Sequence, residues 1–430
     1  MTDSAATIAA RLRPAVTEAL AASEQPVPAV SVAVLVGGEL VTVALGAEPT
    51  SRFQACSISK PIAAAVALRL GLDLDSDVND LLRSWRLPAP ADWPAVVTVR
   101  HLLSHSGALT TSGFPGYAEG EELPTLVEIV DGEGPANTGA VRVDGIPGTA
   151  CRYSGGGYQI LQLILEDIGG APFAELAERL VLAPLGMETA GYAPPTDVAV
   201  AHVGGKPVEG GWKTYPEQAA AGLWCTPSDL VRFFTALREA AAGAEKAFLP
   251  AELATEVLTE VVPGFGLGVQ LASDPLGDRF GHGGSNHGYR CAAEASREGN
   301  WATSVMTNAD EGSFLTFTLL QVIADALGFP RTSAAVKNPE AANEAWLARH
   351  SGAYRTELGI ELNLEVIDGH LHLKVAGQPA LIFGPTGDTV AYAPYAHAEL
   401  RFDAEGDLAG SVELHQFGGV TRAVRQSLDG

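Results

Sequence analysis

The chain of 430 residues carries 27 basic and 51 acidic side chains, and its formal net charge at pH 7 is −24. Because this excess of negative charge repels phosphate groups, we expect neither nucleic acid nor an anionic membrane among its partners. Hydrophobic residues make up 47% of the chain and charged residues 18%, which excludes a disordered protein and predicts a globular one with more than one domain.

The four cysteines are scattered singly, with neither a Cys-x-x-Cys pair nor a Cys/His cluster. This pattern argues against a zinc site and against a disulfide framework. The chain starts Met-Thr-Asp-Ser, without the basic region and apolar core of a secretory signal, and no apolar stretch approaches the ~18 residues of a membrane-spanning helix. We therefore expect a cytoplasmic protein with reduced thiols and no membrane partner.

The first 45 residues predict a helix followed by a β-hairpin. Apolar residues recur every four positions from Ile8 to Leu20, which is typical of an amphipathic helix. Two apolar runs, 29–36 and 40–45, are separated by a turn that contains Gly37 and Gly38.

Ser57 and Lys60 stand at the expected start of a long helix, in front of the apolar run 62–72. Residues three apart lie on one face of a helix, so the hydroxyl and the ammonium group point the same way. A lysine whose pKa is lowered by burial can take the proton of a serine nucleophile, and the helix N-terminus offers free N–H groups to an oxyanion. The alternative is that Ser57 only caps the helix and that Lys60 is solvated.

Residues 73–260 are mostly helical by pattern, with breaks at Gly- and Pro-rich loops. His101 and His105 are four residues apart, a spacing that places two metal ligands on one helix face. Because no glutamate accompanies them in the His-Glu-x-x-His manner, we interpret both as histidines that anchor a loop.

Tyr153 follows a Gly- and Pro-containing turn and precedes three glycines, so we expect it to project from a loop before a helix over 159–168. A tyrosine beside an ammonium group has a lowered pKa and can shuttle protons. The alternative is a half-buried loop aromatic. The glycine triplet lacks the Gly-Lys-Ser/Thr continuation of a nucleotide-binding loop.

The runs 265–271, 279–284, 290–296 and 301–307 predict antiparallel strands, and a helix over 314–327 closes this part of the chain. One of these strands ends at His282-Gly283-Gly284, where glycines mark a close approach by a ligand or another backbone. A polar segment, 331–345, reads as a linker. From residue 346 to 430 short alternating runs predict a β-only domain, a small barrel.

Three motifs resemble, in their order and separation, those of the class C β-lactamase and penicillin-binding-protein family. They are Ser57-Ile-Ser-Lys60, Tyr153-Ser154-Gly155 and His282-Gly283-Gly284. The resemblance covers about 5–330 and implies an α/β (α+β) fold, with an antiparallel sheet flanked by helices plus an all-helical lobe. It also implies a catalytic domain over 1–330, followed by the linker and a lipocalin-like barrel.

The resemblance assigns a role to each site residue. Ser57 would be the nucleophile, Lys60 and Tyr153 would take its proton and return it to the leaving group, and the backbone N–H groups of Ser57 and Ser285 would form the oxyanion hole. The substrate-binding residues it implies are His282, Gly283, Gly284 and Trp224. It implies no metal or organic cofactor.

Two positions depart from the β-lactamases of this family. Gly155 replaces the asparagine of Tyr-x-Asn, which removes a side-chain amide that grips the substrate. His282 replaces the lysine of Lys-Thr-Gly, which removes a partner for the β-lactam carboxylate. The His-x-Gly variant is similar to that of D-aminopeptidases, DD-peptidases and family VIII carboxylesterases.

We therefore expect a serine hydrolase that acts on small carboxylic esters or on D-amino-acid and peptide amides. Two alternatives stay open: a transacylase or peptide-cyclising thioesterase with the same Ser57, and a non-catalytic penicillin-binding-like protein. The oligomeric state is left open. If the barrel overhangs the cleft, Arg422 and Arg425 are the cations we expect to meet a substrate carboxylate.

Overall fold

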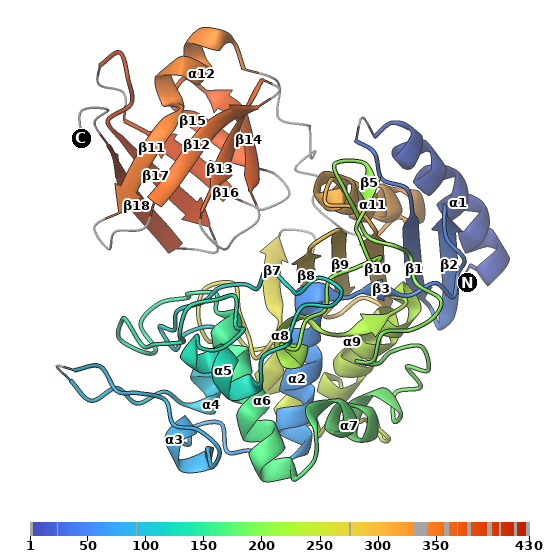
Figure 1. Ribbon diagram of the computed structural model, residues 1–430. Coiled ribbons are helices and arrows are strands. Elements are labelled where there is room, and N and C mark those ends of the chain that lie inside the picture. The colour runs from blue at the N-terminus through green and yellow to red at the C-terminus, as the bar shows by residue number, and fades with distance from the viewer. Residues whose placement is uncertain are drawn as a thin grey trace. The chain divides into compact units, whose positions relative to one another are not determined.

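The computed structural model describes residues 3–23, 25–91, 93–274, 277–329, 342–356, 361–367, 369–375, 380–393, 398–403, 406–416 and 419–426. The chain divides into two compact units, Met1–Thr332 and Ser333–Gly430, each described here by itself (Figure 1). Residues 331–341 of the expected linker, and Asp368 of an expected hairpin turn, lie outside the described residues.

An antiparallel six-stranded sheet forms the centre of the first unit, in the order β2-β1-β10-β9-β8-β7. All seven residues of β10 are buried, because helices cover both faces of the sheet there. The predicted hairpin is confirmed, and both of its turn glycines have positive φ, as a tight hairpin turn requires. The strands are β1 (Val30–Val36), β2 (Glu39–Leu45), β7 (Gln270–Asp274), β8 (Gly277–Asn286), β9 (Tyr289–Ser296) and β10 (Trp301–Thr307).

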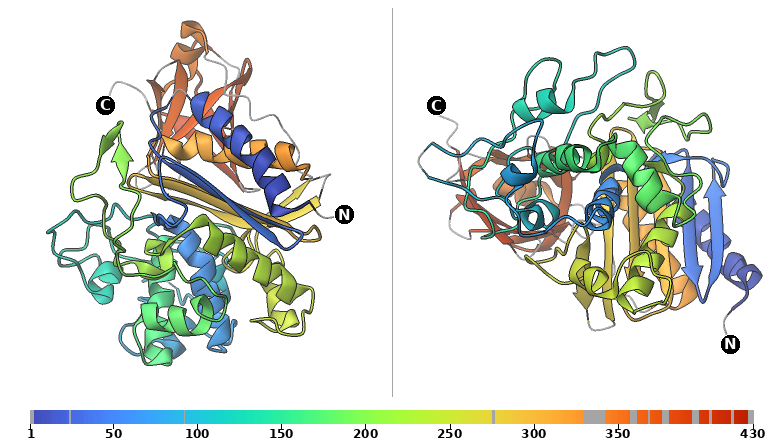
Figure 2. Two further views of the ribbon diagram at one scale, coloured as in Figure 1. Left: turned by 90° about the vertical axis from the view of Figure 1, so that its right-hand side faces the viewer. Right: turned by 90° about the horizontal axis from the view of Figure 1, so that it is seen from below.

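Helices pack on the two faces of this sheet (Figure 2). On one face lie α1 (Ala5–Ala21) and α11 (Gly312–Leu327), and on the other lies α9 (Pro227–Ala241). The alternation of strand residues explains the two cores: Val32 packs with α1 and α11, whereas its neighbour Ala33 belongs to the core on the other side. The helix expected from the four-residue spacing is α1, which runs through Pro14.

A mainly helical lobe completes the first unit, and in it α2 and α6 pack against each other within the larger core. Its helices are α2 (Ser59–Arg69), α3 (Val78–Leu81), α4 (Val99–Leu103), α5 (Leu126–Asp131), α6 (Gly155–Gly169), α7 (Phe173–Ala177), α8 (Gln218–Ala221), α10 (Ala251–Val257) and the short turns η1 (Cys56–Ile58) and η2 (Glu178–Leu182). The first unit also contains two small pairs of strands, β3 (Phe53–Gln54) with β6 (Trp224–Cys225) and β4 (His202–Val203) with β5 (Lys206–Pro207). Among the described residues, none of the helices combines the length and the apolar character needed to cross a bilayer.

Two local expectations are wrong. The strand expected from residue 265 begins only at Gln270, because 265–269 is an irregular segment with isolated bridges. The glycine triplet is the first turn of α6, with Ser154 as its N-cap. A Cβ on Gly155 would lie 2.6 Å from Phe114, and one on Gly156 would lie 2.7 Å from Val141, so close packing explains these glycines.

The second unit contains a closed barrel of eight antiparallel strands, which confirms the predicted fold. Alternation fills its interior: Leu362, Leu364, Leu371 and Leu373 are all buried on two paired strands. A helix that the sequence did not predict, α12 (Glu344–His350), begins at the N-cap Asn343. The strands are β11 (Gly352–Thr356), β12 (Glu361–Ile367), β13 (His370–Lys374), β14 (Leu381–Gly387), β15 (Val390–Ala393), β16 (Ala398–Phe402), β17 (Ser411–Gln416) and β18 (Gly419–Arg425).

Candidate active site

Ser57 lies in the short turn η1, between strand β3 and helix α2. From residue 53 to residue 68 every side chain is buried except that of Ser57, which is partly exposed. The preceding Cys56 adopts a positive φ of 52°, and its thiol donates a hydrogen bond to the Gln54 carbonyl. A positive φ is uncommon at residues other than glycine. At Cys56 it turns the chain sharply, so that Ser57 is partly exposed at the start of a buried helix.

Lys60 lies one helical turn after Ser57 and is buried. Its Nζ donates hydrogen bonds to Ser57 Oγ at 3.1 Å and to the Ala220 carbonyl at 2.9 Å. Burial lowers the pKa of Lys60 from 10.5 to about 7. A large fraction of the side chain is therefore neutral near pH 7, which is the state that can accept a proton from the serine hydroxyl.

Tyr153 precedes α6, and its hydroxyl hydrogen bonds with the Ser57 side chain. Lys60 Nζ lies 5.0 Å from the centroid of its ring. The expected lowering of the Tyr153 pKa is wrong: the ring is partly exposed, but loss of solvation around the hydroxyl raises the pKa, and a largely neutral Lys60 does not oppose this. Tyr153 is thus a phenol at neutral pH, able to donate and relay a proton.

His105 packs against Tyr153, with ring centroids 4.2 Å apart. The Ser154 N–H donates to its Nδ1 at 3.1 Å, and burial places the pKa of His105 well below 6.5. The imidazole is therefore neutral and ties the loop of Tyr153 to the loop that follows α4. The interpretation of His105 as a loop anchor agrees with these contacts, whereas its contact with Tyr153 was not predicted.

The His282-Gly283-Gly284 segment lies on β8, beyond Gly281, the last β8 residue that pairs with β7 before the two strands separate. A Cβ on Gly284 would lie 2.5 Å from Cys291 Sγ and 2.7 Å from the Ala55 carbonyl oxygen, so β8 approaches the Ser57 turn closely. At Gly283 the nearest atom would be 3.9 Å away, which leaves open space.

The unpaired edge of β8 presents backbone N–H groups. The Gly283 N–H donates to Gln270 Oε1 at 3.3 Å on the β7 side. Because alternate N–H groups of a strand point the same way, the Ser285 N–H points to that side as well, at the level where no β7 residue pairs. The Ser285 N–H is therefore not used in the pairing of β8 with β7.

His282 carries no positive charge near neutral pH. Burial and the neighbouring Lys60 lower its pKa to about 3, and its Nδ1 donates to the Gly283 carbonyl. Its ring lies 6.1 Å from that of Tyr153, measured between centroids. The position therefore offers no cation to a substrate carboxylate, as the exchange of lysine for histidine predicts.

Trp224 is buried and lies apart from the Ser57–Lys60 contact. It packs edge-on between Trp212 and Tyr289, with centroid distances of 5.5 and 5.8 Å, and it lines a cavity. The structure therefore places it in the wall of a cavity, whereas Lys60 and Tyr153 bond to Ser57 and β8 passes next to the Ser57 turn at Gly284.

The sequence did not predict the groups that are distant in the chain but form hydrogen bonds with the site residues and their neighbours. The Ala220 carbonyl is 160 residues from Lys60 in the chain, and Asn286 Nδ2 donates to Gln54 Oε1 at 2.7 Å and to the Ala221 carbonyl at 3.1 Å. One signal existed: Asn286 stands two residues after the His282-Gly283-Gly284 motif.

The profile of the Beta-lactamase family matches residues 8–328. Penicillin-binding protein 4* of Bacillus subtilis is 24% identical over 415 residues, which cover 87% of this chain and 88% of that protein. The D-aminopeptidase of Gluconobacter oxydans is 25% identical over 349 residues, which cover 78% of this chain and 63% of the aminopeptidase. The structure of the octameric penicillin-binding protein homologue from Pyrococcus abyssi superimposes with a TM-score of 0.62 at 20% identity, over 97% of this chain and 99% of that chain.

Proposed function

Because the chain belongs to the Beta-lactamase family of hydrolases, we propose that it is a serine hydrolase that forms an acyl-enzyme on Ser57. The observation that carries this proposal is the contact between Ser57 Oγ and a buried lysine whose pKa is about 7. A serine hydroxyl becomes a nucleophile at neutral pH when a neighbouring base takes its proton, and Lys60 is that base.

Acylation begins when Ser57 Oγ attacks the substrate carbonyl carbon and its proton passes to Lys60, directly or through the Tyr153 hydroxyl. The carbonyl oxygen becomes an oxyanion, which the N–H groups of Ser57 and Ser285 stabilise. When the bond to the leaving group breaks, Tyr153 donates a proton to the departing oxygen or nitrogen, and Lys60 replaces that proton.

Deacylation repeats these steps with water. A water molecule attacks the acyl carbon, and its proton passes to the Lys60–Tyr153 pair. The bond between the acyl carbon and Ser57 Oγ then breaks, and the pair returns the proton to Ser57 Oγ. The products are the carboxylic acid and free enzyme. No step requires a charge on Tyr153, which agrees with its raised pKa.

The substrates that fit this site are small carboxylic esters and amides of D-amino acids or short peptides. Neutral His282 provides no partner for a β-lactam carboxylate, and Gly155 provides no side-chain amide. The similarity to a D-aminopeptidase supports an amide with a free amino group as one such substrate.

Labelling with a fluorophosphonate probe tests the nucleophile, with intact mass as the readout. Wild type is expected to gain one probe mass, and Ser57→Ala none. The matched control is Ser84→Ala, which removes an exposed hydroxyl that donates to Asp167 and is expected to label like wild type. Equal labelling of Ser57→Ala and Ser84→Ala would overturn the assignment.

A further inference from the structure

The loop 104–112, which follows α4, carries most of the strained backbone of the described chain. A positive φ at a residue other than glycine occurs at four of the residues that the structure describes: Cys56, His105, Ala108 and Thr111. Cys56 precedes Ser57, and the other three lie on the loop, with φ between 51° and 63°. Such conformations are costly for a residue with a side chain and cluster at functional sites. The loop therefore requires a functional explanation.

This loop pairs with the segment that carries Tyr153. Four backbone N–H groups of the segment 148–156 donate to carbonyls of the loop at 2.7–3.1 Å: Gly148 to Ser106, Arg152 to His105, Gly155 to Ser112 and Gly156 to Thr111. Tyr153 lies within the paired segment, so the shape of the loop sets the position of its backbone.

His105 bonds to the chain on both sides of Tyr153. Its carbonyl accepts from the Arg152 N–H at 2.7 Å, and its Nδ1 accepts from the Ser154 N–H at 3.1 Å. Its ring packs on the ring of Tyr153, with centroids 4.2 Å apart and an angle of 31° between the planes. One residue thus fixes the backbone before Tyr153, the backbone after it and the phenol ring.

The Nε2 atom of His105 argues against a role in packing alone. Because Nδ1 accepts from a backbone N–H, the neutral imidazole carries its proton on Nε2. This atom is buried and has no hydrogen-bond partner in the described part of the chain. A leucine would fill the same space without that cost, so packing does not account for a histidine at this position.

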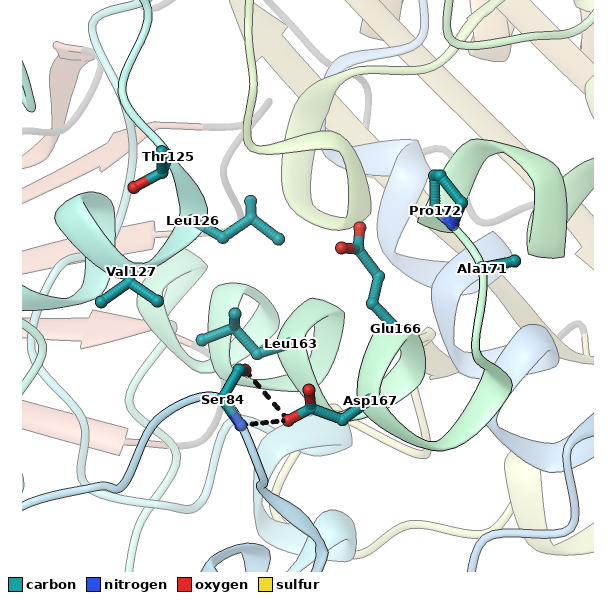
Figure 3. A pocket seen from close by; sticks show the side chains of 9 residues that line it. All are labelled: Ser84, Thr125, Leu126, Val127, Leu163, Glu166, Asp167, Ala171 and Pro172. Carbon is teal, nitrogen blue, oxygen red and sulfur yellow. Dashed lines mark hydrogen bonds between the residues drawn. The ribbon is translucent and has the colours of Figure 1, made fainter.

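Helix α6, which follows Tyr153, is anchored at its other end by separate contacts. Figure 3 shows Asp167 on α6 beside Ser84, whose N–H and hydroxyl donate to Asp167 Oδ2 at 2.9 and 3.0 Å. The Arg83 N–H donates to the same oxygen at 2.7 Å. These contacts stabilise α6 near its C-terminus, remote from Tyr153, and they offer a purely structural control.

We propose that His105 is a positioning residue for Tyr153, which holds the phenol hydroxyl at Ser57 Oγ and so sets the proton transfer to the leaving group. His105 acts through Tyr153 and transfers no proton itself. The inference rests on the proposed acyl-enzyme, and it adds a residue to which the proposed mechanism assigns no part. A displacement of a reacting group by ~1 Å costs about 100-fold in rate, which sets the size of the expected effect.

The leaving group provides a readout that a merely structural role would not change. p-Nitrophenolate departs without a proton, whereas the alkoxide of ethyl acetate requires one from Tyr153. Both esters form the same acetyl-enzyme, and kcat/KM reports the acylation step in which this proton is transferred. His105→Leu is expected to lower kcat/KM for ethyl acetate about 10- to 100-fold more than for p-nitrophenyl acetate.

His105→Asn is expected to recover most of the activity toward ethyl acetate. Asparagine and leucine have nearly the same shape, but asparagine tolerates a positive φ, and its Oδ1 replaces Nδ1 as acceptor for the Ser154 N–H. If thermal unfolding shows that His105→Leu is not folded, His105→Gln takes its place. The longer amide reaches the position of Nε2 and leaves the Ser154 N–H without an acceptor.

Two further variants separate positioning from stability. Asp167→Ala removes the anchor at the far end of α6, so it is expected to lower the unfolding temperature and to leave the ratio of the two kcat/KM values unchanged. Tyr153→Phe removes the hydroxyl and is expected to show the full leaving-group effect. Because His105 acts through Tyr153, the double variant with His105→Leu should lose no more than Tyr153→Phe alone.

Three results would overturn the proposal: equal losses for the two esters in His105→Leu or His105→Gln, the same selective loss in His105→Asn, or additive losses in the double variant. A selective loss of ethyl acetate hydrolysis in Asp167→Ala would overturn it as well. Ser57→Ala tests the proposed function separately. Hydrolysis of both esters retained in that variant would refute the acyl-enzyme, whatever the His105 variants show.

Discussion

The Nζ atom of Lys60 lies 3.1 Å from Ser57 Oγ, and within the segment 53–68 that holds both residues only the serine is not fully buried. Removing the ammonium group from water favours the neutral amine, and this is why the pKa falls to about 7. The burial that makes Lys60 a suitable base therefore also lowers the free energy of unfolding at any pH at which the lysine of the unfolded chain is charged.

Catalysis is expected to follow the ionisation of Lys60. The neutral amine is the base, so kcat/KM for p-nitrophenyl acetate should rise about tenfold per pH unit below pH 7 and level off above it. The raised pKa of Tyr153 predicts no descending limb up to about pH 9. A profile that already falls between pH 7 and pH 9 would contradict the assignment of Lys60 as base and Tyr153 as neutral donor.

Stability is expected to depend on the same group. The Lys60 pKa is about 7 in the folded protein, against 10.5 for a solvated lysine of the unfolded chain, so between these values the unfolded state binds more protons and stability rises with pH. Relative to Lys60→Met, the unfolding free energy of wild type should increase by ~3–5 kcal/mol from pH 7 to pH 10.5. Urea unfolding at several pH values measures this, and parallel curves for the two proteins would refute it.

Two adjacent glycines of β8 are expected to behave differently. Gly284→Ala puts a methyl group within 2.5–2.7 Å of Cys291 Sγ and the Ala55 carbonyl, so it should lower the unfolding free energy by ~1–3 kcal/mol. Gly283→Ala meets nothing closer than 3.9 Å and should leave stability within ~0.5 kcal/mol of wild type. Thermal unfolding of the two variants measures both stability losses. A larger loss in Gly283→Ala than in Gly284→Ala would show that β8 does not approach the Ser57 turn in this way.

The ester preference can be tested directly against a β-lactam. Since His282 is neutral and Gly155 is part of a helix, kcat/KM for p-nitrophenyl acetate or butyrate should greatly exceed that for nitrocefin. Both substrates are followed by absorbance in one buffer at about pH 7.5, where Lys60 is largely the neutral base. A nitrocefin value equal to or above the ester values would mean that another group binds the β-lactam carboxylate.

The sequence predicted most of the elements, and it predicted that Ser57, Lys60 and Tyr153 would lie together, because periodicity and short motifs are local. It did not predict the partners that arrive from distant segments, such as the Ala220 carbonyl at Lys60 or the ring of His105 at Tyr153. At the glycine triplet, 155–157, a local signal in the sequence gave a wrong prediction. Its low helix propensity predicts a loop, yet tertiary packing against Phe114 and Val141 keeps it at the start of α6.

The two arginines that the sequence analysis considered together, Arg422 and Arg425, have different surroundings on β18. Arg425 donates to the carbonyls of Arg349, Ser351 and Ala409 and to the Tyr354 hydroxyl, and its guanidinium lies 4.7 Å from the centroid of the Tyr354 ring. Its donors thus hold α12, β11 and residue 409 together, and they are not free for a substrate.

Arg425→Met removes the guanidinium that donates to three part-buried carbonyls and should destabilise the second unit by ~1–3 kcal/mol, seen as an early transition in thermal unfolding. Arg422 is exposed on the same strand, so Arg422→Met is the matched control and should unfold like wild type. Of the two, only Arg422 keeps a guanidinium for a substrate carboxylate. If Arg422 binds a substrate carboxylate, Arg422→Met should lower kcat/KM for peptide esters with a free carboxylate and leave kcat/KM for p-nitrophenyl acetate unchanged. If the ratio of these two kcat/KM values is the same in the variant and in wild type, Arg422 does not bind the substrate.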